Sequence, residues 1–518
     1  MPLPTHTPVI VGVGQRCDTS SAPGEGLSPL QALVEVARSA AADSGCPDPA
    51  ALLRALDAVT VIRLFSDTNP RFKSPFGAMA SPPWSLAQAL GAQPRQREYA
   101  AAGGDSPQTK LTQACRQVAA GEAGLVLLAG VEALRTELAA RRAGLQLDWS
   151  DAAPAGDAPA EPPLRYFTAE EELHGMRSAS AMYGLIAQAM RHAKGLTPAQ
   201  YSARSAELFA RFAAVARDNP YATRRAGYSA AQIAAVGADN PMVGTPYPKL
   251  MTASAFVDQA AAILVCSEQR AQALGIPRER WVYLHGAAAA HAPWFVSERA
   301  DLVRSQAMRL AAQQALAFAG RSVADMAMFD FYSCFPSAVQ AACDALGVAE
   351  TDPRALTVTG GLSFFGGAGN NYSSHAIAEM VSRLRRQPQA FGLVLANGGL
   401  LTKESIGVYS AERSDGAWLF EAGAPIQACI DAEPAVALNH RPSGSAVVET
   451  FCVLWHKQQP QHGCVFGRLP DGARFLAKLA ASPEELRAIG ERDAIGLSGT
   501  VQAENGVNWF RLDRLPAP

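Results

Sequence analysis

Several hallmarks of other protein classes are missing from this chain of 518 residues. No apolar run reaches the roughly 18 residues of a membrane-spanning helix. The net charge of −2 gives no electrostatic case for binding nucleic acid or an anionic membrane. No basic segment precedes the first strand-like run, PVIVGVG, so we predict that there is no signal peptide. These absences favour a cytoplasmic globular protein.

The cysteines also lack the spacing of a structural site. Nine are scattered along the chain, and none belongs to a C-x-x-C pair. An odd, scattered set is typical of reduced thiols rather than of a disulfide framework or a zinc site. We therefore expect no metal ion and a reducing compartment.

The length predicts two or three domains rather than one core. Strands predicted at 8–14 and 125–129 and helices at 29–42 and 107–120 indicate an α/β fold. Two stretches, 100–130 and 358–396, both follow the order strand, glycine turn, helix, strand, which suggests an internal duplication. We place one half at 1–270, with a mostly helical insertion at about 140–240, and the other at 271–414.

The predicted secondary structure changes near residue 415, from alternating strands and helices to mostly short strands. Short strands are predicted at 426–430, 446–455, 464–468 and 474–479, followed by one helix at 482–489 and two further strands. This pattern predicts a separate β-rich domain over 415–518, plausibly a small barrel similar to an OB fold.

The stretch Thr357 to Met380, TVTGGLSFFGGAGNNYSSHAIAEM, is the richest in glycine. Its loop lets the backbone approach a ligand closely, because glycine and asparagine tolerate positive φ. Asn370 and Asn371 serve either turn geometry or substrate contact. His375, on the first turns of the following helix, either orients or protonates substrate or is a buried helix histidine bonded to the backbone.

Two other junctions carry polar groups. Tyr332, Ser333 and Cys334 lie between a predicted strand and a helix beginning near Pro336, where α/β folds place functional side chains. Tyr332 is either functional or fills space with a hydrogen-bonded hydroxyl. Asp105 and Ser106 follow the turn at Gly103-Gly104, and they either cap the next helix or contact a ligand.

Six motifs, spread over most of the chain, resemble the thiolase superfamily, and more closely its thiolase-like protein type 1 branch, whose members carry an added C-terminal domain. They are PVIVGVGQ, GGDSPQ, LLAGVEAL, FVDQAAAILVCS, FYSCFPSAVQ and GGLSFFGGAGNNYSSHAIAEM. The resemblance implies a five-layered αβαβα fold of two similar halves, an inserted CoA-binding loop domain, a homodimer, and a coenzyme A thioester as substrate or ligand.

The catalytic residues of thiolases do not carry over. Aligned through the GVE motif, the nucleophilic cysteine falls on Gly104, and the histidine of the G-H-P motif falls on Gly367. The second cysteine, of the C-x-G turn, falls on Ala396. Thiolase chemistry of the Claisen type needs a thiolate and a second acid or base, so we do not expect ordinary thiolysis.

Groups that bind a thioester remain. Ser254 matches a serine that contacts the pantetheine arm in thiolases. Backbone donors at Gly104, Gly367 and Asn397-Gly398 are candidates for an oxyanion hole. Asp105, Ser106 and Asn371 are candidate substrate contacts.

Tyr332 takes the place of the asparagine or histidine of the N-E-x-F or H-D-x-F motif. In the thiolase-like steroid side-chain aldolases a tyrosine at this place serves retro-aldol cleavage, together with a separate partner that holds an OB-like domain. Here Ser333 replaces the aspartate of their Y-D-x-F motif. The sequence favours an enzyme that acts on acyl-CoA, by acyl transfer or by retro-aldol cleavage with Tyr332 and His375 as catalytic groups. The alternative is a non-catalytic acyl-CoA-binding or scaffold protein.

Overall fold

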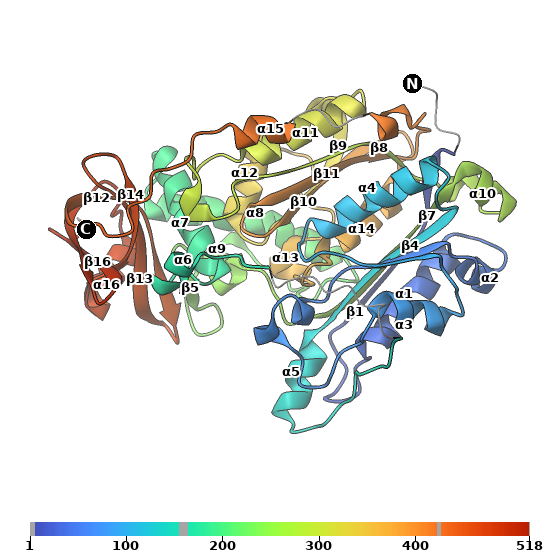
Figure 1. Cartoon of the computed structure of the whole chain (residues 1–518), viewed down its shortest axis with the longest axis horizontal. Helices are drawn as coiled ribbons and strands as arrows, with labels where there is room; N and C mark the ends of the chain where they lie inside the picture. The colour runs from blue at the N-terminus through green and yellow to red at the C-terminus, as the bar shows by residue number, and fades with distance from the viewer. Residues whose placement is uncertain (1–5, 155–163, 422–425, 517–518) are drawn as a thin grey trace.

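Two β-sheets covered by helices form the body of the protein (Figure 1). The structure, a computed structural model, describes residues 6–154, 164–421 and 426–516. The first sheet has the strand order β1-β7-β4-β2-β3 and the second the order β8-β11-β10-β9. Their strands are β1 (Pro8–Asp18), β2 (Ala58–Val61), β3 (Gln96–Tyr99), β4 (Leu125–Ala133), β7 (Asp258–Ser267), β8 (Tyr283–His291), β9 (Met326–Phe331), β10 (Phe391–Gly398) and β11 (Lys403–Ser410).

The two sheets confirm the predicted duplication. From β1 to β2 the neighbouring strands pair antiparallel, antiparallel and parallel. From β8 to β9 the pairings follow the same sequence. Each half therefore builds the same four-strand core with the same connections, and the first half adds β3 at its edge.

Two helices lie between the sheets and complete a five-layered αβαβα arrangement. The helices α4 (Ser106–Ala119) and α14 (Tyr372–Arg386) contact each other and strands of both sheets. The outer faces carry α1 (Pro29–Asp43) on the first sheet and α11 (Gln306–Phe318) on the second (Figure 1). Pro107 starts α4, and Leu111, Cys115 and Val118 form its buried face, so Cys115 is a core residue. The predicted thiolase fold is thus confirmed.

The remaining helices cover the sheets or form the insertion. Those of the two halves are α2 (Pro49–Arg54), α3 (Pro82–Leu90), α5 (Leu134–Arg142), α10 (Glu268–Ala273), α12 (Pro336–Leu346) and α13 (Gly361–Phe364). The insertion holds α6 (Ala169–Leu173), α7 (Ala179–Ala193), α8 (Pro198–Asp218) and α9 (Ala230–Ala234). In the described ranges no helix is both long and apolar enough to cross a membrane.

The C-terminal domain is a closed β-barrel-like sheet, as predicted. Its order is β13-β14-β16-β15-β12, and β13 also pairs with β12. A hairpin of the insertion extends this sheet, because Gly244 of β5 pairs with Leu454 of β12. The elements are β5 (Met242–Gly244), β6 (Tyr247–Pro248), β12 (Gly444–His456), β13 (Gln459–Arg468), β14 (Arg474–Leu479), β15 (Ser498–Glu504), β16 (Val507–Leu512) and α16 (Pro483–Glu491).

One predicted strand of this region is wrong. Residues 426–430 belong to the helix α15 (Ile426–Asp431), which packs against α11 and β8 of the second half. Ile426 and Ile430 are four residues apart, a spacing that puts both on one face of a helix. In so short a run, periodicity does not separate a strand from a helical turn.

Candidate functional site

The turn before α4 and the end of β9 meet at Gly104. A β-carbon at position 104 would lie 2.5 Å from the hydroxyl oxygen of Tyr332 and 2.5 Å from the backbone oxygen of Asn397. The Ser373 hydroxyl donates to the Gly104 carbonyl over 2.7 Å, and the Gly103 N–H donates to Asn370 Oδ1 over 2.9 Å. The structure therefore brings the GGDS turn, Tyr332, the glycine-rich loop and the end of β10 into one site.

Tyr332 fills the space that a side chain at position 104 would need. It is buried, and its ring meets that of Tyr372 edge-on at 5.4 Å. No described residue forms a hydrogen bond with its hydroxyl. Burial raises the pKa of Tyr332 far above its ordinary value, and Cys334, Asp105 and Tyr166 raise it further. Tyr332 is therefore a neutral phenol at physiological pH, able to donate a proton but poorly suited to remove one.

An ion pair between Asp105 and Lys403 lies beside this phenol. Lys403 Nζ is 3.0 Å from Asp105 Oδ1 and donates to the Ala102 carbonyl over 2.6 Å. Burial raises the pKa of Asp105, and Lys403 opposes the shift. Two glycines make room for the pair, because a β-carbon at Gly103 or Gly398 would lie 2.2 or 2.0 Å from Asp105 Oδ1. The carboxylate is therefore a stronger base than an exposed aspartate.

Ser106 is not the N-cap of α4. The N-cap of α4 is Asp105, whose side chain makes no capping hydrogen bond. The Ser106 hydroxyl donates to the Ala101 carbonyl over 2.5 Å. This hydrogen bond stabilises the turn of residues 101–106, and the turn orients Asp105 toward Lys403.

The glycine-rich loop offers fewer free donors than expected. The Gly367 N–H donates to the Ser254 carbonyl over 2.9 Å, so it is already committed. Within the described ranges no acceptor is found for the Gly104 N–H, which leaves it available to an oxyanion. Asn371 is buried, and both atoms of its side-chain amide are without a hydrogen-bond partner in the described part of the chain. The Ser254 side chain is half-buried, next to Phe256, which is 63% exposed.

His375 is a buried histidine of α14. Its Nδ1 is 2.9 Å from Gln15 Oε1, and its ring meets that of Phe365 edge-on at 5.1 Å. Burial lowers the pKa of His375 to about 3, so the ring is neutral. The partner of Nδ1 is thus a side chain of β1 and not the backbone group expected for a structural histidine, and in the described part of the chain Nε2 is buried without a hydrogen-bond partner.

A second polar cluster lies on the ladder between β10 and β11. Asn397 is directly opposite Glu404, and Gly398 is opposite Lys403. The Asn397 side chain donates to the Tyr183 hydroxyl over 3.0 Å. In the described part of the chain, Asn397 Oδ1 and both carboxyl oxygens of the buried Glu404 have no hydrogen-bond partner. Burial raises the pKa of Glu404 well above its ordinary value, which favours the neutral acid over the carboxylate, and Arg299 opposes the shift.

Sequence reasoning missed Lys403, Glu404 and Tyr183. One signal was available, since the sequence TKES places a Lys-Glu pair at the start of an otherwise apolar strand. A charged pair at such a place is unusual unless it has a partner or a function.

In the described ranges no group of three His, Cys, Asp or Glu side chains is arranged to hold a metal ion.

Glu132, the glutamate of the GVE motif, supports the floor of the site. It is fully buried, accepts the Phe65 N–H over 2.7 Å, and lies so close to Gly369 that a β-carbon there would be 2.1 Å from Oε1. Burial raises the pKa of Glu132 from 4.5 to about 8, and Asp67 and Glu137 add to the shift.

Glu132→Gln is expected to stabilise the protein increasingly as the pH rises from 4.5 to 8. The unfolded chain releases this proton near pH 4.5, whereas the folded protein keeps it to about pH 8, so ionisation favours unfolding between these values. The gap in free energy of unfolding between variant and wild type should widen by about 3–4 kcal/mol between pH 5 and pH 8. Urea unfolding at pH 5 and 8 measures it. The exposed Glu25→Gln is the control, and an equal gap at both pH values for Glu132→Gln would contradict the prediction.

Solved structures of distant sequence share this architecture. The acetyl-CoA acetyltransferase from Syntrophomonas wolfei superposes with a TM-score of 0.56 and 15% identity, over 79% of this chain and 100% of that one. The Ltp2-ChsH2(DUF35) aldolase superposes with a TM-score of 0.57 and 19% identity, over 80% and 99%. At these identities the likeness concerns the fold alone.

A more similar structure is that of a monomeric SCP2-thiolase-like protein type 1 from Mycobacterium smegmatis. It shares 38% identity and a TM-score of 0.81 with this protein, over 98% of this chain and 99% of that one. Residues 425–506 match the domain family described as the thiolase-like protein type 1 additional C-terminal domain. The chain belongs to the thiolase-like protein type 1 family. No curated protein is significantly similar to it in sequence. Because the relative is monomeric, the homodimer expected from the resemblance is not supported.

Proposed function

We propose that this protein binds a β-hydroxyacyl-CoA and cleaves its Cα–Cβ bond by a retro-aldol reaction. One observation carries the proposal: the Tyr332 hydroxyl fills the position of the thiolase nucleophile at Gly104 and lies beside the buried pair of Asp105 and Lys403. A neutral acid next to a desolvated carboxylate is the pair of groups that a retro-aldol step needs.

In the proposed reaction, Asp105 takes the proton of the β-hydroxyl group. The Cα–Cβ bond breaks, a carbonyl forms at Cβ, and the electron pair of the broken bond becomes the enolate of the thioester. The Tyr332 hydroxyl and the Gly104 N–H donate hydrogen bonds to the enolate oxygen. Return of the proton from Asp105 to Cα then gives the shortened acyl-CoA, releases an aldehyde or ketone and regenerates the carboxylate.

The cysteines argue against thiolysis. Positions 104 and 396 carry no thiol. Burial raises the pKa of Cys115 and of Cys334 to about 12, so neither supplies a thiolate at neutral pH. We include in the proposal that the pantetheine arm passes Ser254, and that the protein is cytoplasmic, a location that suits nine free cysteines.

A panel of β-hydroxyacyl-CoAs of different chain length and branching tests the proposal. We expect release of an aldehyde or ketone in a 1:1 ratio with a shorter acyl-CoA. Carbonyl derivatisation measures the first product, and chromatography of the CoA esters measures the second. Calorimetry with free CoA and with acyl-CoA measures binding in parallel. Binding without turnover across the panel would refute the lyase and favour the scaffold protein, whereas absence of binding would refute both.

A further inference from the structure

Arg474 of the C-terminal domain makes a buried contact with the thiolase-like body. It is the first residue of β14 and is fully buried. Its Nε and Nη2 donate to the two carboxyl oxygens of Glu449, on β12, over 2.7 and 2.6 Å. Its Nη1 donates to the backbone carbonyls of Ser297 and Arg299, over 2.8 and 2.6 Å. The charge of Arg474 is thus neutralised within its own domain, and its remaining donor holds a segment of the second half.

That segment carries a second buried arginine, which reaches the site. Arg299 Nη1 donates to the Leu400 carbonyl over 2.7 Å, and Nη2 donates to Thr402 Oγ1 over 2.9 Å. Both acceptors belong to the turn of residues 398–402, which joins Gly398 at the end of β10 to Lys403 at the start of β11. The guanidinium therefore fixes the spacing between the two strand ends that carry the polar groups of the site.

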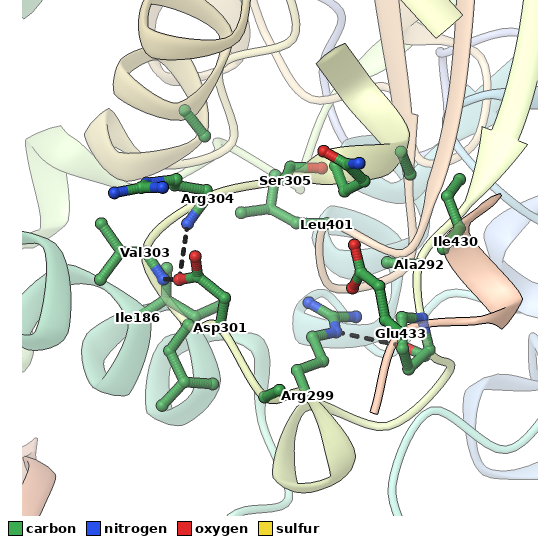
Figure 2. A pocket seen from close by; sticks show the side chains of 16 residues that line it. Ile186, Ala292, Arg299, Asp301, Val303, Arg304, Ser305, Leu401, Ile430 and Glu433 are labelled. Carbon is green, nitrogen blue, oxygen red and sulfur yellow. Dashed lines mark hydrogen bonds between the residues drawn. The ribbon is translucent and has the colours of Figure 1, made fainter. Parts of the chain in front are cut away.

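The turn needs such support because of its conformation and surroundings. Leu401 has a φ of 55°, a left-handed conformation that is strained for a residue other than glycine. Its side chain lines a cavity of about 150 Å³ together with Arg299, Ile186 of α7 and Ile430 of α15 (Figure 2). On this side the turn borders a cavity, so the hydrogen bonds from Arg299 help to position it.

We propose that Arg474 is a positioning residue for the site, acting through Arg299 on the turn of residues 398–402. The C-terminal domain thereby sets the place of Lys403 and of its partner Asp105. Other contacts of this domain go elsewhere: Asp493 pairs with the fully buried Arg191 of α7, and Thr450 donates to the Leu185 carbonyl. Both contacts hold α7, which reaches the end of β10 through Tyr183 and Asn397. In the described residues α7 makes no hydrogen bond to residues 398–402, so the proposed hydrogen-bond path to the turn runs through the two arginines.

Hydrogen exchange of the intact protein, followed by mass spectrometry of peptides covering residues 398–404, tests this proposal. Arg474→Met is expected to speed exchange of the turn amides by about tenfold. Arg191→Met removes an equally buried arginine from the same interdomain boundary and is expected to leave these amides unchanged. Arg299→Lys is expected to speed exchange of these amides as much as Arg474→Met does. The double variant should exchange no faster than either single variant, because both residues lie on one path.

Unchanged exchange of the turn in a folded Arg474→Met or Arg299→Lys variant would overturn the proposal, as would an equal rise in Arg191→Met. If Arg474→Met does not fold, exchange of the turn amides in Arg299→Lys alone tests the proposal. A kinetic measurement rests on the proposed function: Arg474→Met should lower kcat about tenfold with the affinity for CoA unchanged. Exchange is measured without substrate, so the proposed reaction and the arginine path can fail separately.

Discussion

Tyr332→Phe is expected to lower turnover of a β-hydroxyacyl-CoA by about a hundredfold or more, because it removes the proton that stabilises the enolate oxygen. The same change should leave the free energy of unfolding within about 0.5 kcal/mol of wild type, since no described residue bonds to this hydroxyl. Steady-state assays and urea unfolding of the same preparation measure the two effects. Loss of activity without loss of stability would separate chemistry from packing.

Tyr372→Phe is the matched control. Tyr372 is equally buried and touches Tyr332, but its hydroxyl is bonded to Asp330 over 3.1 Å and to Thr359 over 2.6 Å. The variant should therefore lose about 1–2 kcal/mol of stability and keep most of its turnover per folded molecule. Full activity of Tyr332→Phe would rule out the role proposed for Tyr332, whatever Tyr372→Phe does.

Gly104→Cys is expected not to restore a thiolase but to destabilise the protein by about 2–3 kcal/mol, the cost of overpacking a buried site. The new β-carbon would lie 2.5 Å from both Tyr332 Oη and the Asn397 backbone oxygen, and the backbone oxygen has little freedom to move. Shortening the tyrosine should recover part of the loss, so Gly104→Cys combined with Tyr332→Ala should be more stable than the sum of the two single changes predicts.

A double-mutant cycle in urea measures this coupling. Gly237→Cys is the control, because a β-carbon at position 237 meets no atom within 4 Å, and its effect should stay within about 0.5 kcal/mol. Additive effects at positions 104 and 332, or a stable Gly104→Cys variant with Tyr332 intact, would contradict the view that the tyrosine took over the space of the nucleophile.

Local pattern was enough to predict the elements of the two halves. The helix expected at 107–120 is observed at Ser106–Ala119, because a proline near its start and a glycine turn after it mark both ends. The resemblance to thiolases predicts that the glycine-rich loop lies beside the end of β9, and in the structure the Leu362 N–H donates to Ser333 Oγ. The short run at 426–430 was misassigned, since its fold depends on packing against α11 rather than on its own periodicity.

The chemistry of the site was less predictable, because it depends on contacts between distant residues. The contact between Lys403 and Asp105 depends on the register of β10 and β11, and no local signal in the sequence specifies that register. Arg474 and Arg299 are ordinary cations in the sequence, and only tertiary structure shows that both are buried. The local pattern allows two roles for His375, and only tertiary structure shows that its Nδ1 contacts Gln15, on a strand at the other end of the chain.

The strand order also determines when each part of the chain can fold during synthesis. β1 is made first, yet its ladder partner is β7, from Pro8 opposite Ser267 to Asp18 opposite Asp258, and its one further bridge is to Val282. The first strand therefore leaves the ribosome with an unpaired apolar edge and keeps it until the whole insertion has been translated. The hairpin of β5 and β6 waits longer still, for Leu454 of β12. Slowing translation before residue 258 should lengthen the time in which a chaperone binds the nascent chain.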